Sequence, residues 1–268
     1  MSRIKLVLID VDGTLIGTGS TVHPRVLAVL ERARDAGLYL AICTGRPLYS
    51  RAKEYAALVS ATEPHIFQNG AQVARLDGSS IHASVLPKSA YLALVALSRR
   101  TGHALEVYAQ DHCYAEIFTQ VAVDHQRLIE LEATRRDLLS LTQPVLRVQW
   151  VTALAAKAEL ERLMQGIPDI QFASAGTPDM PDATFTSVTR LGTSKLEGAA
   201  KLGAYYGVSL AETMMVGDGD NDIELIAGVG LGVAMGNASA GAKVAAQHVV
   251  GEVNDGGLAD ALEMALAG

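Results

Sequence analysis

The amino-acid sequence predicts an α/β fold: a doubly wound parallel sheet into which an α+β domain is inserted. Two observations predict the sheet, because short apolar runs recur along the chain and helical stretches separate them. A third predicts the insertion, since this alternation stops near residue 84 and resumes near residue 187. We therefore expect a core of residues 1–83 and 187–268 and an inserted domain of residues 84–186.

The first third of the chain supplies strands and helices in alternation. Residues 4–9 are apolar on both faces, which is typical of a central parallel strand, and residues 38–44 repeat the pattern. A helix is expected over residues 24–35, because Pro24 is favourable in a first helical turn. A second helix should follow the turn after residue 44, and residues 65–70 form a third short strand. This β-α-β-α-β rhythm indicates a doubly wound parallel sheet.

The insertion should mix helices with paired antiparallel strands, and the rhythm of the core then returns. The elements expected in the insertion are a helix at 87–100, a hairpin of 104–109 with 112–118, a strand at 145–152, a helix at 153–165 and paired strands at 170–175 and 183–189. Those expected after it are helices at 193–207 and 222–230 and strands at 213–218 and 231–238. Ser194 and Glu197 fit a capping box, which would place Lys195 at a helix N-terminus.

Composition narrows the possible partners. The net charge is −7 without a basic run, which disfavours nucleic acid and anionic membranes but allows a small phosphorylated substrate. Cys43 and Cys113 show no pairing pattern, and seven histidines show no metal-ligand spacing. No apolar run is long enough to cross a membrane, and the first residues do not resemble a signal peptide. We expect a cytoplasmic protein in a reducing compartment.

Polar clusters lie where the expected parallel strands end. Open α/β sheets bind ligands outside the carboxyl ends of their strands, so these clusters should converge. They are Asp10 with Asp12, Thr44–Arg46, Asp218–Asp222, and Lys195 at a helix start.

Asp10 and Asp12 are two apart at a strand end, so their side chains should point the same way. Two close carboxylates repel, and one tends to hold a proton unless a cation binds. The pair can therefore supply a nucleophile and a general acid/base. The alternative is an ordinary turn, because Asp-Gly is common turn chemistry.

The run GDGDND at 217–222 adds further carboxylates. It is not a calcium loop, because Ile223 stands where that loop needs glycine and Val229 where it needs glutamate. A magnesium site shared with Asp10 is the better interpretation, since Mg²⁺ prefers a few carboxylates with water and substrate phosphate. A solvated acidic turn that caps a helix is the alternative.

Thr44 and Lys195 could hold a phosphate. The Thr44 hydroxyl and the N–H groups of Gly45 and Arg46 stand at an expected helix start, where phosphate oxygens bind well. Lys195 could neutralise a phosphate or hold Asp10 in place. An ordinary helix cap and a solvated lysine are the alternatives.

With these residues assembled, the chain resembles the haloacid dehalogenase (HAD) superfamily, specifically its Cof-type phosphatases with a type IIB cap on a Rossmann-like core. Four motifs in family order carry the resemblance: DxDGT at 10–14, Thr44 in TGRP, Lys195, and GDGDND at 217–222. QNGA at 68–71 and VAMGNA at 233–238 are also similar to that branch. One departure is Ser187, because many relatives carry a glutamate about eight residues before the motif-three lysine.

The resemblance implies a role for each residue of these motifs. Asp10 would attack phosphorus and become an aspartyl phosphate, while Asp12 would protonate the leaving oxygen and then activate water. Asp10, the backbone carbonyl of Asp12, and Asp218 would hold Mg²⁺, and Asp222 would position Lys195 or a metal-bound water from outside the direct ligands. Phosphate would be bound by Thr44, Gly45, Arg46, Lys195 and Asn221.

The resulting hypothesis is a Mg²⁺-dependent phosphatase that acts on a small phosphorylated metabolite, a sugar phosphate or a cofactor phosphate. Residues of the inserted cap on possible loops that face the substrate include Tyr108, Asp111, His112 and Arg147, although His112 and Arg147 could equally be solvated. A phosphomutase or phosphotransferase would use the same motifs. A non-enzymatic phospho-acceptor module is a further alternative, which the chain length and the retention of Asp12 disfavour.

Overall fold

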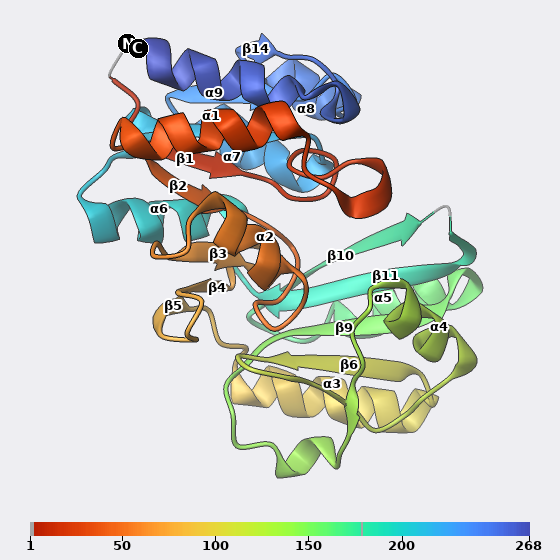
Figure 1. Cartoon of the computed structure of the whole chain (residues 1–268). Coiled ribbons are helices and arrows are strands. Elements are labelled where there is room, and N and C mark those ends of the chain that lie inside the picture. The colour runs from red at the N-terminus through yellow and green to blue at the C-terminus, as the bar shows by residue number, and fades with distance from the viewer. Residues whose placement is uncertain (1–2, 178) are drawn as a thin grey trace. The chain divides into compact units, whose positions relative to one another are not determined.

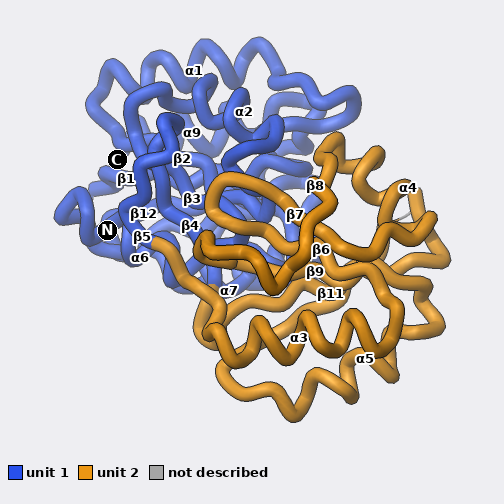
Figure 2. The backbone as a smooth tube through the Cα atoms, turned by 90° about the horizontal axis from the view of Figure 1, so that it is seen from below, with its two compact units in different colours: residues 1–82, 194–268 blue, residues 83–193 orange. Residues whose placement is uncertain are grey.

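The structure is a computed structural model that describes residues 3–177 and 179–268. It contains two compact units, Met1–His82 with Ser194–Gly268, and Ala83–Thr193 (Figure 2). The chain therefore leaves the first unit once and returns to it, as an insertion does. The return was expected at residue 187, but the strand that contains this residue continues to Arg190 within the sheet of the second unit.

The first unit is built on a parallel sheet of five strands in the order β14-β13-β12-β1-β2 (Figure 1). All neighbouring pairs are parallel, and β1 lies in the middle beside both β12 and β2. The strands are β1 (Leu6–Ile9), β2 (Tyr39–Ile42), β12 (Thr213–Gly217), β13 (Leu231–Ala234) and β14 (His248–Val249).

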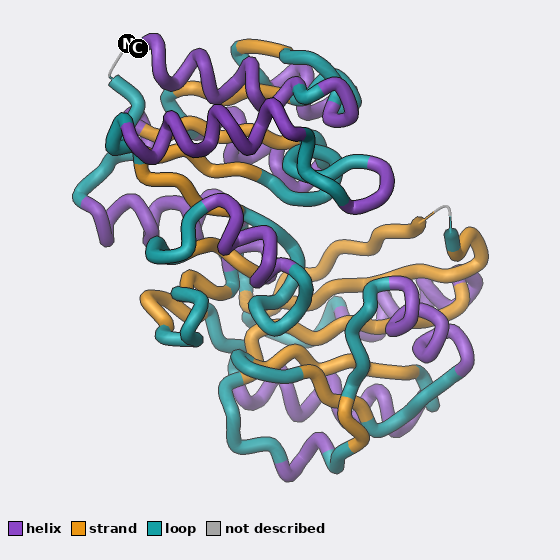
Figure 3. The backbone as a smooth tube through the Cα atoms, in the orientation of Figure 1, coloured by secondary structure: helices purple, strands orange, loops and turns teal. Residues whose placement is uncertain are grey.

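Helices pack against the faces of the sheet and connect its strands, as Figure 3 shows with helices in purple and strands in orange. Helices α1 and α9 pack on each other, and α6 packs on α7. Leu30 of α1 and Leu262 of α9 share one apolar core with β1, whose residues are all buried. The helices of this unit are α1 (Pro24–Asp35), α2 (Ala52–Val59), α6 (Lys195–Tyr206), α7 (Ile223–Gly228), α8 (Ala240–Ala245) and α9 (Gly257–Ala267).

The third expected strand leaves the parallel sheet. Its residues His65–Phe67 (β3) lie beside β2 but pair with this part of the chain through one isolated parallel bridge, between Ile66 and Cys43, the residue that follows β2. They instead form an antiparallel hairpin with Gln72–Ala74 (β4) and a small sheet with Ser80–Ala83 (β5). The turn between β3 and β4 lies against residues that follow the ends of β2 and β12, because Asn69 contacts Thr44 and Asn221.

The second unit is a mixed, largely antiparallel sheet in the order β10-β11-β9-β6-β7-β8. Its strands are β6 (Ala104–Ala109), β7 (Cys113–Ala115), β8 (Thr134–Arg135), β9 (Val145–Ala153), β10 (Ile170–Thr177) and β11 (Met180–Arg190). Its helices are α3 (Lys88–Thr101), α4 (Gln120–Leu128) and α5 (Lys157–Met164). Leu94 of α3, Met164 of α5 and Trp150 of β9 belong to one apolar core. The predicted hairpin of β6 and β7 is present.

These elements confirm the predicted fold class, a Rossmann-like parallel core with an inserted α+β domain. Within residues 3–177 and 179–268, no helix has the length and apolarity needed to cross a membrane.

Candidate active site

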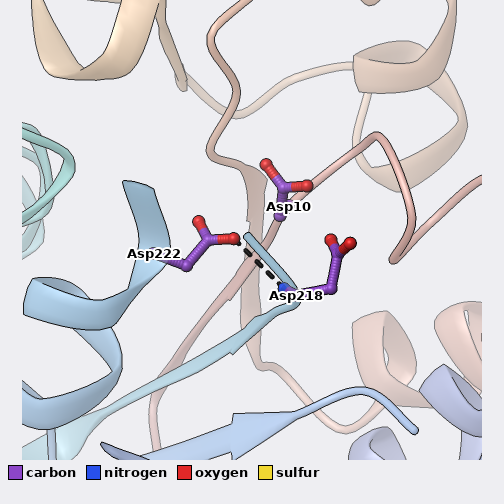
Figure 4. Close-up of side chains that lie close together, drawn as sticks. All are labelled: Asp10, Asp218 and Asp222. Carbon is purple, nitrogen blue, oxygen red and sulfur yellow. Dashed lines mark hydrogen bonds between the residues drawn. The ribbon is translucent and has the colours of Figure 1, made fainter. Parts of the chain in front are cut away.

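Two neighbouring strands deliver carboxylates to the same edge of the parallel sheet. Ile9 pairs in register with Val216, so Asp10 and Asp218 both follow the ends of their strands (Figure 4). The backbone N–H of Asp10 donates to the carbonyl of Val216 at 2.9 Å, which extends the ladder to the site itself. Asp10 is only 6% exposed, because it stands at the end of a fully buried strand.

Lys195 connects two of the carboxylates. Its ammonium lies 2.6 Å from Oδ1 of Asp10 and 2.6 Å from Oδ1 of Asp222. Ser194 caps helix α6 by accepting from the N–H of Glu197 at 3.2 Å, so Lys195 is the first residue of the helix, as the capping pattern predicts. The lysine is 2% exposed, which excludes the solvated alternative.

Asp222 and Thr14 fix the loop after β12. The second oxygen of Asp222, Oδ2, accepts from the N–H groups of Asp218 at 3.1 Å and Gly219 at 3.0 Å, and the first of these bonds is drawn in Figure 4. Thr14 donates its hydroxyl to Oδ1 of Asp218 at 2.9 Å. Both oxygens of Asp222 therefore have partners, which suits a positioning role better than direct metal ligation.

Gly13 allows the first loop to approach the second. A Cβ atom at this position would lie 2.2 Å from Oδ2 of Asp218, and the φ angle of +85° is one that residues with side chains rarely adopt. Glycine is therefore required here for the loops after β1 and β12 to meet.

Burial and mutual repulsion shift the pKa values of the cluster. Burial raises the pKa of Asp10 well above its usual range; Lys195 opposes this shift, whereas Asp222 adds to it. Burial likewise raises the pKa of Asp218 to about 6, against the hydrogen bond from Thr14. Burial alone would lower the pKa of Lys195, but Asp10 and Asp222 outweigh it and raise that pKa. One ammonium among three carboxylates leaves the site short of positive charge.

The cluster fits a hard divalent cation. Asp10, Asp218 and Asp222 each offer a carboxylate oxygen, and these oxygens all lie within 4.8 Å of one another. Oxygen donors of this kind are the ligands that Mg²⁺ prefers. Burial first, and repulsion between the carboxylates in addition, raise the pKa of Asp10 and of Asp218, and a cation here would relieve the repulsion.

The expected phosphate-binding turn after β2 has a second role. Arg46 donates from Nε to Oδ2 of Asp12 at 2.8 Å and from a terminal nitrogen to Oδ1 at 2.6 Å. This bidentate pair raises the pKa of Arg46 chiefly through its hydrogen bond to Asp12. Thr44 is buried, and its hydroxyl accepts from the N–H of Arg46 at 3.1 Å. The expected helix start at this turn is wrong, because helix α2 begins only at Ala52, so this hydrogen bond stabilises a turn and is not a helix cap.

The turn between β3 and β4 contacts three of the predicted motifs, and sequence reasoning gave it no role. Asn69 accepts from the side chain of Asn221 at 3.0 Å and donates its N–H to the carbonyl of Thr44 at 2.9 Å. A Cβ atom on Gly70 would lie 1.9 Å from the carbonyl oxygen of Ser194. Gln68, Asn69 and Gly70 all have positive φ angles. The Asn-Gly dipeptide after a strand was the available signal, since it favours such backbone angles.

In the second unit, two of the residues expected near the substrate prove to be strand residues. Tyr108 lies in β6, is fully buried and donates to Glu106 at 2.7 Å, so it is not on a loop. Arg147 lies in β9 and is 8% exposed, which excludes the solvated alternative. His112 hydrogen-bonds to Thr134 at 2.6 Å near the surface.

Comparison with known proteins assigns the chain to a family of hydrolases. The model of the haloacid dehalogenase-like hydrolases matches residues 7–262, and the chain belongs to that family. The predicted HAD superfamily membership is thereby confirmed, and with it the prediction of an enzyme, a hydrolase of the phosphatase type.

Several named relatives match nearly the whole chain. The 5-amino-6-(5-phospho-D-ribitylamino)uracil phosphatase YitU of Bacillus subtilis is 28% identical over 268 residues, with 95% of this chain and 94% of the relative covered. The pyridoxal phosphate phosphatase YbhA of Escherichia coli is 28% identical over 257 residues, with 92% and 93% covered.

Solved structures agree on the fold. BT1666 from Bacteroides thetaiotaomicron, described among phosphatases of the HAD superfamily, is 26% identical and superposes with a TM-score of 0.83 over 98% of this chain and 95% of its own. The HAD subclass IIB sugar phosphatase BT4131 superposes with a TM-score of 0.81 over 97% of this chain and 98% of its own at 23% identity, which shows a shared fold.

Proposed function

We propose that the protein is a Mg²⁺-dependent phosphatase that hydrolyses a small phosphorylated metabolite through an aspartyl-phosphate intermediate on Asp10. The observation that carries the proposal is the buried contact of Lys195 with Asp10 and Asp222, beside Asp218 at the end of parallel strands. The names of relatives support the substrate class, since YitU and YbhA are named as phosphatases of a phosphorylated metabolite and a cofactor phosphate.

Asp10 would act as the nucleophile. Its carboxylate oxygen forms a bond to phosphorus as the bond from phosphorus to the leaving oxygen breaks. Lys195 holds the carboxylate in place and keeps a positive charge beside the phosphoryl oxygens. When held by Asp10, Asp218 and the backbone carbonyl of Asp12, Mg²⁺ would supply the further positive charge that a phosphate dianion needs among these acids.

Asp12 would move the protons. It gives a proton to the leaving oxygen and then takes one from the water that attacks phosphorus, which releases phosphate and restores Asp10. The ion pair with Arg46 orients the carboxylate for the second step. Asp12 donates a proton in the first step, so the ion pair must open before that step. We assign two roles to Arg46: it positions Asp12, and it binds phosphate.

Thr44, Gly45 and Asn221 would complete the phosphate site. The turn that carries Thr44 is fastened to Asn69, and Asn69 also holds the side chain of Asn221. The inserted unit, expected over residues 84–186, would serve as the cap that selects the substrate. We also propose a cytoplasmic location.

The test is phosphate release from a panel of phosphorylated sugars and cofactors, with and without Mg²⁺. We expect Mg²⁺-dependent release from some esters. Transfer of the phosphoryl group to a second substrate, without free phosphate, would instead support the mutase alternative. Membership of a hydrolase family disfavours the phospho-acceptor alternative.

A further inference from the structure

One face of the sheet in the second unit carries a row of buried polar side chains. Arg147 of β9 lies opposite Tyr108 of β6 and opposite Thr189 of β11. Residues directly opposite one another in antiparallel strands point to the same face, so these three side chains share it. Val148, the next residue along β9, belongs to the apolar core with α3 and α5 and so faces the other way.

The carboxylate on this polar face already has its partners. Glu106 is fully buried and accepts from the hydroxyl of Tyr108 at 2.7 Å, from the amide of Gln126 at 3.1 Å, and hydrogen-bonds with Nδ1 of His125 at 3.2 Å. Glu106 is therefore satisfied without Arg147. Across residues 3–177 and 179–268, no carboxylate forms an ion pair with Arg147.

Arg147 itself is poorly satisfied. It is 8% exposed, and one terminal nitrogen donates to Gln149 at 3.3 Å. The guanidinium carbon lies 4.0 Å from the ring centroid of Tyr108, whereas Nε is buried and lacks a hydrogen-bond partner. Stacking on a ring offsets only part of the cost of burying a charge. The fork of N–H donors on a guanidinium matches a carboxylate or a phosphate.

We propose that Arg147, with the hydroxyl of Thr189 opposite it, binds an anionic group of a small-molecule ligand, a carboxylate or a phosphate. In its kinetic form the proposal rests on the proposed phosphatase function. It rests also on the proposed role of the inserted unit as the cap that selects the substrate, so the preferred substrate would carry an acid group besides the phosphate that is hydrolysed. Arg147 would be a residue that determines specificity and takes no part in the bond changes.

A substitution at Ser187 can place a carboxylate of the protein itself beside Arg147. It lies opposite Gln149, two residues from Thr189 on the same face, and is therefore diagonal to Arg147. Diagonal neighbours on a sheet are within reach of long side chains. A glutamate at this position would bring a carboxylate to the guanidinium, whereas a glutamine would match its size without its charge.

The first experiment observes the unpartnered atom directly and requires no activity. The ¹H–¹⁵N resonance of the Arg147 Nε–H group is assigned by its loss in R147K, and the protein is titrated with malonate and, separately, with inorganic phosphate. We expect a saturable shift of this resonance with at least one probe, and no such shift in S187E. An unperturbed resonance with both probes would overturn the proposal.

The second experiment measures kcat/KM for pairs of esters that differ in a second acid group. Glycerol 3-phosphate against 3-phosphoglycerate tests a carboxylate, and fructose 6-phosphate against fructose 1,6-bisphosphate tests a phosphate. We expect the wild type to prefer the more acidic member of one pair, chiefly through KM. This preference should fall at least ~10-fold in R147Q. A ratio that is the same in R147Q and the wild type would overturn the proposal.

S187E and S187Q test the same site with Arg147 still present, so the proposal can be tested even if R147Q does not fold. S187E should lose the preference and S187Q should keep it, because only glutamate brings a charge. Equal ratios in the two variants would count against the proposal. If the wild type releases phosphate from no ester but the Nε–H resonance still shifts, the phosphatase function fails and the anion site stands. If esters are hydrolysed but the Nε–H resonance is unperturbed, the phosphatase function stands and the anion site fails.

Discussion

Arg46 holds the carboxylate of Asp12 with two hydrogen bonds, at 2.8 and 2.6 Å, across 34 residues of sequence. The Asp12 side chain is 54% exposed, so the ion pair contributes little stability, and its importance lies in the orientation that it imposes.

Arg46→Gln should lower kcat by about 10-fold or more in the wild-type background, because the proton-transfer group loses its orientation. The same change should have little further effect on kcat when Asp12 is already Asn. Steady-state kinetics of the two single variants and the double variant measure this coupling. An equal rise of KM in both backgrounds, with kcat unaltered, would show that Arg46 binds phosphate and does not position Asp12.

Lys195→Met should abolish most activity and weaken the fold. Removing the ammonium leaves Asp10 and Asp222 buried without a cation, so we expect kcat to fall at least ~10²-fold and the free energy of unfolding to fall by about 3 kcal/mol. Lys201→Met, at an exposed position of the same helix, is the matched control. Kinetics and denaturant unfolding of both variants, without added metal, test the prediction. Equal stability of the two variants would contradict it.

Mg²⁺ binding should weaken as the pH falls through about 6. The pKa of Asp218 is raised to about 6, so the carboxylate is protonated below this pH and a cation must displace the proton. Thr14→Val removes a hydrogen bond that lowers this pKa, and so the midpoint should move to higher pH. Calorimetric titration with Mg²⁺ between pH 5 and about 8 measures both curves. Chelation should stop turnover, and Mg²⁺ should restore it; full activity in excess chelator would exclude the metal role.

His65 should make the fold less stable in mild acid. Burial lowers the pKa of His65 to about 4, and the ring lies between the N–H of Ile42 and the carbonyl of Ser60 at 3.0 and 2.8 Å. Because an unfolded histidine has a pKa of about 6.5, the unfolded state takes up a proton first as the pH falls. The contribution of His65 is therefore complete above pH ~6.5 and is lost towards pH 4, by about 3 kcal/mol at most.

The measurement for His65 is the free energy of unfolding against pH in the wild type and in His65→Gln. Glutamine can keep both hydrogen bonds without titrating, so this variant should show a shallower slope between pH 4 and about 6.5. His248→Gln changes an exposed histidine and should leave the slope unaltered. Identical slopes for all three proteins would show that His65 does not titrate as expected.

The sequence predicts the positions of the carboxylates well, because a buried strand that ends in a carboxylate leaves few alternatives. Asp10 and Asp218 follow β1 and β12, and the parallel register alone brings these residues to one edge. Lys195 follows from the helix cap at Ser194. These features depend on local pattern and on the rule that parallel strands present their carboxyl ends together.

Contacts between distant loops are harder to predict. Nothing in the spacing of Asp12 and Arg46 indicates that the guanidinium would take the carboxylate rather than a phosphate. Asn69 is similar, because the role of its turn depends on β3 leaving the parallel sheet to form a hairpin, and the apolar run at 65–67 is compatible with either arrangement. In both cases the tertiary structure decides between partners that the sequence leaves equivalent.

The claim that Asp10 is the nucleophile can be tested most directly with Asp12→Asn and p-nitrophenyl phosphate. This leaving group needs no protonation, so Asp10 should still be phosphorylated, whereas hydrolysis of the aspartyl phosphate should be slow without Asp12. We predict a burst of about one nitrophenolate per chain and a phosphoryl group on Asp10, located by mass spectrometry of the quenched protein. A burst that persists in the Asp10→Asn, Asp12→Asn double variant, or a phosphoryl group on another residue, would contradict the account.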